Sequence, residues 1–389
     1  MIKSKDRTSA ARRLLPLWKV IGHLRGLAIL TVVVNHAAFF GVMQYRFSHG
    51  QVTSCRAPFG IPWESVMPGW VALQELTRFC VPLFLVLAGH YVAGFSRTWT
   101  TIWSQARKLL FPFLFWSLLA WGYTAWFHPP GWKSGEFLAR LLLGETQAGY
   151  YFIPLILQYY VLAHWAVPWV KRKPVSALSI SAILQLSWIG FNYFAVSVRG
   201  GVIDFPWMLD PLPECGFPRF FFFFIFGIWI GNYPGRLKSL IDGRGPVLFV
   251  LALMSAVLLL GEHGVIFHTI RKPGAEIELW KAFLAMAQWK VTTSLWSLAV
   301  ILLLFRLGQL DLLSGKWMWR LGGWAYVIYI LNWPCLQPVV DLLGSWTIDP
   351  GLHGLVFLVL CALGVFLPLL ILSVVRRWLP WARGVLGYS

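Results

Sequence analysis

Charged residues are scarce in this sequence, where they make up 12% of 389 residues against 58% hydrophobic residues. A soluble domain of this length needs far more charged surface, and a disordered chain lacks long apolar runs. The five cysteines form no CxxC pair, so a zinc or thioredoxin motif is excluded and no metal site is expected. These absences favour a helical membrane protein.

Ten apolar runs approach the roughly 20 residues that a helix needs to cross a bilayer. We therefore predict an all-α, polytopic transmembrane bundle of about ten spans. It forms a single domain over residues 1–389, with a basic N-terminal segment at 1–19 and a tail at 376–389. The predicted spans are 24–43, 70–95, 109–127, 151–170, 177–198, 217–232, 247–260, 292–305, 321–343 and 355–375.

The formal net charge of +18 arises from short basic clusters between the apolar runs. No nucleic-acid recognition motif contains them, so the expected partner is the lipid bilayer. Every second connection carries such a cluster, and basic connections stay in the cytoplasm. We therefore expect both termini to be cytoplasmic and the longer opposite connections, where an acceptor would bind, to face outward. The clusters lie within 3–19, 97–108, 171–173, 236–244, 306–320 and 376–383.

The first predicted span, LRGLAILTVVVNHAAFF, contains two ionisable residues, Arg25 and His36. They are eleven residues apart, so they share one face of a helix and are separated by about 16 Å along its axis. Ionisable groups inside a membrane usually face a cavity or a partner. The alternative is structural: an arginine that reaches the inner interface and a histidine that bonds a neighbouring helix.

Two more pairs of ionisable residues allow a structural and a functional interpretation. Glu75 and Arg78 are three residues apart, so they either neutralise each other within the membrane or line a cavity beside the first span. Arg107 and Lys108, at the inner end of the third predicted span, either orient the helix or bind the phosphates of an acyl carrier.

Several segments occur in an order that resembles the membrane acyltransferase-3 family. The Arg-x10-His spacing of the first span is the hallmark of that family, and the resemblance extends from about residue 24 to residue 375. The other matching segments are RFCVPLFLVLAGHYVAG (78–94), QARKLLFPFLFWSLL (105–119), GYYFIPLILQYY (149–160), FFFFIFGIWIG (221–231) and LGGWAYVIYILNWP (321–334).

This chain departs from the family pattern at four positions. Ala88 stands where the family has serine, Ser104 replaces the first arginine of R-x-x-R, and Tyr151 replaces tryptophan. Asn332 replaces a late histidine, and asparagine cannot shuttle a proton near neutral pH. His90 is a candidate for a second histidine, with a structural role as the alternative.

The resemblance implies an integral-membrane acyltransferase that uses acyl-CoA, with acetyl-CoA expected, as a donor substrate and needs no cofactor. The acceptor would be a hydroxyl of an extracytoplasmic or lipid-linked glycan or glycolipid. His36 would be the general base, Arg25 would hold the donor, and Arg107 and Lys108 would also bind the donor. The expected substrate-binding residues are Arg78, Glu75, His90, Glu145, Tyr151 and Asn332, with a solvated loop position as the alternative for Glu145.

The competing interpretation is a transporter or exporter of a glycan or small solute, which would also have polytopic helices and intramembrane charges. The Arg25–His36 register and the lack of detectable repeats favour the enzyme. The oligomeric state is left open by the sequence.

Overall fold

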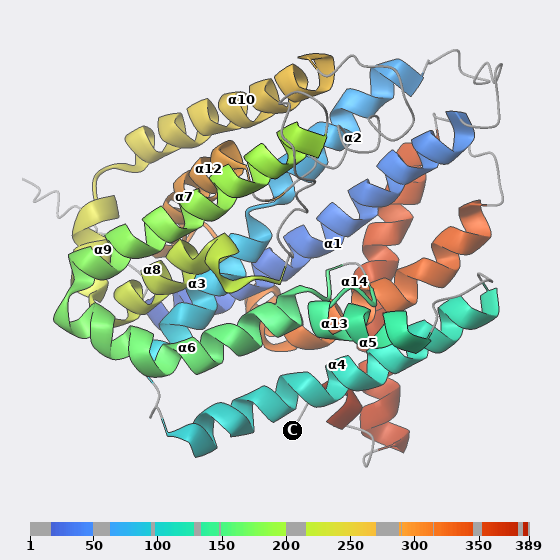
Figure 1. The fold of residues 1–389 in the computed structure, drawn as a ribbon, viewed down its shortest axis with the longest axis horizontal. Helices are drawn as coiled ribbons and strands as arrows, with labels where there is room; N and C mark the ends of the chain where they lie inside the picture. The colour runs from blue at the N-terminus through green and yellow to red at the C-terminus, as the bar shows by residue number, and fades with distance from the viewer. Residues whose placement is uncertain are drawn as a thin grey trace, which may run out of the picture.

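A computed structural model shows how these segments fold into a helical bundle (Figure 1). It describes residues 17–49, 63–94, 98–127, 134–147, 149–199, 215–269, 288, 290–313, 315–344, 352–379 and 384–387. The long helices are α1 (Leu17–His49), α4 (Trp99–Phe127), α6 (Phe152–Arg172), α7 (Pro174–Arg199), α10 (Gly245–Thr269), α12 (Val291–Gln309), α13 (Lys316–Gly344) and α14 (His353–Trp378). The shorter ones are α2 (Trp63–Thr77), α3 (Cys80–Ala93), α5 (Ser134–Leu143), the 3-10 helix η1 (Phe217–Phe220), α8 (Phe221–Asn232) and α9 (Pro234–Ile241).

The helices α1, α3, α8 and α13 form the interior of the bundle, while α4 and α10 lie at opposite edges (Figure 1). The contact between α3 and α8 is so close that a Cβ atom added to Gly89 would collide with the carbonyl oxygen of Phe224. A Cβ atom at Gly227 would likewise collide with the backbone of Val86. Small residues let membrane helices approach in this way, where no hydrophobic effect drives them together.

The second predicted span is interrupted between α2 and α3, at Arg78 and Phe79. Side chains from other helices satisfy the carbonyl groups that the interruption leaves without helical partners. Trp296 donates its indole N–H to the oxygen of Leu76 at 3.0 Å, and Asn35 Nδ2 donates to the oxygen of Gln74 at 2.9 Å. Because unsatisfied backbone groups are costly inside a membrane, these bonds make the interruption stable.

The prediction of an all-α, polytopic membrane bundle of about ten spans is confirmed. Within the described ranges, nine helical stretches are long and apolar enough to cross a membrane: the eight long helices and the interrupted pair of α2 and α3 over Gly69–Ala93. The predicted span 217–232 is a shorter apolar stretch, in which η1 is followed by the twelve-residue α8. The cytoplasmic placement of both termini stays a prediction.

Candidate active site

Asn332 holds the imidazole of His36 in one orientation. The Nδ1 atom of His36 lies 2.7 Å from Oδ1 of Asn332, and Asn332 Nδ2 donates to the carbonyl oxygen of Gly364 at 3.2 Å. The carbonyl oxygen of Gly364 can only accept, so Nδ2 of Asn332 faces it, and Oδ1 of Asn332 accepts a hydrogen bond from Nδ1–H of His36. The network therefore leaves Nε2 of His36 with a lone pair, as a general base requires.

The Nε2 edge of His36 faces the turn before α6. A Cβ atom placed on Gly149 would lie 3.3 Å from both Nε2 and Cε1 of the ring, and Gly149 has a φ of +85° that favours glycine. The hydroxyl of Tyr329 donates to the oxygen of Gly149, and that of Tyr150 donates to the oxygen of Ile330 at 2.7 Å. Two tyrosines that bond to the backbone thus hold this turn and α13 together beside the base.

Arg25 shares α1 with His36 but has a different environment. Its side chain is exposed, whereas its backbone packs so closely on α13 that a Cβ atom at Gly322 would lie 3.2 Å from Cβ of Arg25. The guanidinium of Arg25 is therefore not enclosed by the bundle as the ring of His36 is.

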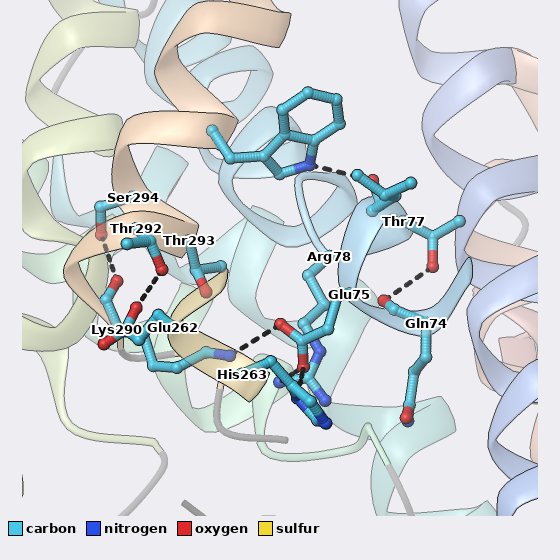
Figure 2. A network of polar contacts seen from close by, with 12 residues as sticks. Gln74, Glu75, Thr77, Arg78, Glu262, His263, Lys290, Thr292, Thr293 and Ser294 are labelled. Atoms are coloured by element: carbon cyan, nitrogen blue, oxygen red, sulfur yellow. Dashed lines mark hydrogen bonds and ion pairs between the residues drawn. The ribbon is translucent and has the colours of Figure 1, made fainter. Parts of the chain in front are cut away.

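Glu75 and Arg78 do not contact His36 but belong to a separate buried cluster (Figure 2). Glu75 Oε1 lies 3.4 Å from Nη1 of Arg78 and 3.7 Å from Nδ1 of His263, and Glu75 Oε2 accepts from Lys290 Nζ at 2.9 Å. Lys290 was not among the residues predicted from the sequence. Its place next to the apolar run 292–305 was the only signal of burial in the sequence.

The other predicted substrate-binding residues are spread over the bundle. Tyr151 is buried at the start of α6, its hydroxyl donates to Oε1 of Gln288 at 2.6 Å, and its ring lies 5.1 Å from Cζ of Arg219. Arg219 is buried and was not predicted, because one arginine beside a short apolar run carries no further signal. Glu145 is exposed in the turn after α5, and His90 lies half-buried in the last turn of α3.

The predicted donor-binding pair is exposed on α4. Arg107 and Lys108 precede Leu109, whose carbonyl oxygen accepts a hydrogen bond from Tyr326 at 2.8 Å. Among the residues that the structure describes, no group of three or more His, Cys, Asp or Glu side chains is placed to hold a metal ion.

Comparison with known proteins identifies the family. The acyltransferase-3 family model, described as an acyltransferase domain, matches residues 18–373. The chain belongs to the acyltransferase-3 family. This membrane acyltransferase has no match among curated proteins and none among solved structures. Family membership selects the enzyme over the transporter that the sequence left as an alternative.

Proposed function

We propose that this acyltransferase transfers an acyl group, expected to be acetyl, from cytoplasmic acyl-CoA to a hydroxyl of an extracytoplasmic or lipid-linked glycan. The observation that carries the proposal is the orientation of His36, whose Nδ1 is engaged by Asn332 while Nε2 faces the Gly149 turn. An acceptor hydroxyl that approaches Nε2 beside that turn would be within reach of a base.

The chemistry follows from this geometry and balances without a cofactor. Nε2 of His36 takes the proton of the acceptor hydroxyl as its oxygen attacks the thioester carbonyl, forming the new C–O bond. The C–S bond then breaks, and the imidazolium returns the proton to the departing thiolate of CoA. Asn332 stabilises the imidazolium form because its Oδ1 accepts from Nδ1 in both protonation states.

The donor is proposed to reach His36 from the cytoplasmic side along α1. Arg25 would bind a phosphate of CoA, because its planar guanidinium offers two parallel hydrogen bonds to such a group. Arg107 and Lys108 on α4 would add positive charge at the same end. The rise of about 16 Å between Arg25 and His36 suits the long, thin arm of CoA, whose head then stays in the cytoplasm.

The test uses purified full-length protein in detergent with acetyl-CoA labelled in its acetyl group. We expect release of free CoA thiol, together with label transferred to the lipid-linked glycan fraction of the host membrane. The His36→Ala protein, compared at equal monodispersity, should give neither product above background. Transfer at the wild-type rate by a well-folded His36→Ala protein contradicts the proposed chemistry. If the label appears only in free acetate, formed by hydrolysis of acetyl-CoA, the glycan acceptor is contradicted.

A further inference from the structure

A buried ion pair joins the start of α12 to the end of α2 (Figure 2). The side chains of Glu75 and Lys290 are both 0% exposed, and their Oε2 and Nζ atoms are 2.9 Å apart. The adjacent α10 closes the cluster from one side. Its Glu262 accepts hydrogen bonds from Tyr193 and Thr292, and its His263 faces Oε1 of Glu75.

Lys290 occupies a position that is unfavourable for a cation unless a carboxylate is present. It is the N-cap residue of α12, where the positive end of the helix dipole repels a positive side chain. Burial lowers the pKa of its ammonium group, and the Glu75 carboxylate opposes this effect. The location of residue 290 therefore depends on Glu75.

The segment anchored in this way reaches the candidate active site. Gln288 precedes Lys290 by two residues, and its Oε1 accepts the hydroxyl hydrogen of Tyr151 at 2.6 Å. Tyr151 is the N-cap residue of α6, so it links the helix to the turn that precedes it. A displacement of Gln288 would accordingly be transmitted to Tyr151.

The turn that precedes Tyr151 also faces His36. It contains Gly149, two residues before Tyr151, and a Cβ atom added to Gly149 would lie only 3.3 Å from Nε2 of His36. The amide nitrogens of Phe152, Ile153 and Leu155 bond to the oxygens of residues 149 to 151, at 3.0 to 3.2 Å. The turn and the first turn of α6 thus form one hydrogen-bonded unit beside the base.

We infer that Glu75 and Lys290 are positioning residues for the acceptor side of the enzyme. Their ion pair holds Gln288 in place, Gln288 holds Tyr151, and Tyr151 holds the Gly149 turn at the distance from His36 that an acceptor hydroxyl needs. Neither residue touches the reacting atoms. The inference rests on the proposed role of His36 as the base, and it assigns Glu75 a role different from direct substrate binding.

The first experiment separates the two substrates kinetically. Lys290→Met is compared with Arg306→Met, which removes a salt bridge of 2.7 Å to Asp242 at the other end of the same helix. Acetyl-CoA is the donor, and n-octyl β-D-glucoside is the hydroxyl probe. We expect Lys290→Met to raise the KM for the glucoside about tenfold, with the KM for acetyl-CoA unchanged, because only acceptor-side contacts are lost. Arg306→Met should change neither KM, and Lys290→Arg should restore the acceptor KM.

The second experiment needs no catalysis, so it distinguishes a failure of the inference from a failure of the proposed function. Hydrogen exchange of the Phe152, Ile153 and Leu155 amides in the full chain should become faster in Lys290→Met and stay unchanged in Arg306→Met. If wild-type protein does not acylate the glucoside but this difference is seen, the acceptor assignment fails and the positioning role stands. Equal exchange in the two variants, or an unchanged acceptor KM, overturns the inference.

Gln288→Leu guards against loss of folding in Lys290→Met. It keeps the ion pair and removes only the hydrogen bond to Tyr151, so it should reproduce the raised acceptor KM and the faster exchange. A Gln288→Leu protein that behaves like wild type in both measurements also overturns the inference.

Discussion

The two ionisable residues of α1 lie in opposite environments. The ring of His36 is enclosed by Asn332 at 2.7 Å and by Trp333, whose ring centroid is 5.5 Å away in an edge-on arrangement. Arg25 is exposed, and among the described residues it has neither a hydrogen bond nor an ion pair. The difference is that the fold fixes the orientation of the His36 ring, whereas it leaves the side chain of Arg25 without a fixed partner among the described residues.

The largest effect on acyl transfer is expected from substitution of His36, whose ring is enclosed by the bundle. His36→Ala should reduce acyl transfer by about 10²- to 10⁴-fold, because the acceptor hydroxyl loses its general base. The measurement is transfer of labelled acetyl at saturating donor. A size-exclusion profile and melting temperature equal to those of wild type serve as the control, and residual transfer within threefold of wild type would contradict the role.

Substitution of the exposed Arg25 should lower the affinity for the acyl donor rather than the rate of transfer. Arg25→Ala is expected to raise the KM for acetyl-CoA about 10- to 100-fold while kcat changes little, as for loss of a charge-assisted hydrogen bond. Arg25→Lys should recover little, because lysine lacks the planar fork. If the wild type uses the acetyl thioester of dephospho-CoA, which lacks only the 3′-phosphate, as readily as acetyl-CoA, a contact with that phosphate is ruled out.

A smaller effect is expected from removing the partner of the base. Asn332→Leu keeps a similar volume but removes the acceptor for Nδ1, so both ring tautomers become accessible and kcat should fall about tenfold or less. The matched control is Asn232→Leu at the end of α8, where Nδ2 of Asn232 donates only to the carbonyl oxygen of Ile228 one turn earlier. An Asn332→Leu protein with wild-type kcat would show that the orientation of His36 does not depend on this contact.

The smallest effect is expected for the exposed pair on α4. Replacing Arg107 and Lys108 together by alanine should raise the donor KM by about two- to fivefold, since solvent-exposed charges contribute about 0–1 kcal/mol each. The effect should shrink as salt is raised from 50 to about 500 mM, because screening removes it. An effect that is independent of salt would point to lost packing rather than lost attraction.

Particular elements show how far the sequence could predict the fold. The long apolar runs predicted helices such as α6 and α14, because a stretch of about 20 apolar residues permits little else in a bilayer. The sequence did not reveal that the run 217–232 begins with the 3-10 helix η1 and leaves only twelve residues for α8, because hydropathy does not distinguish the two helix types. The interruption at Arg78 was also missed, because Asn35 and Trp296, which make it stable, are distant in sequence.

The amino-acid sequence alone was enough to predict a helical membrane protein, a shared helix face for Arg25 and His36, and the family motifs. These properties are local, because periodicity and hydropathy act within one segment. The contact of Asn332 with His36 and the pairing of Lys290 with Glu75 became known only from the packed structure. Their partners are separated by 296 and 215 residues, and no local pattern specifies which buried polar groups satisfy one another when helices pack.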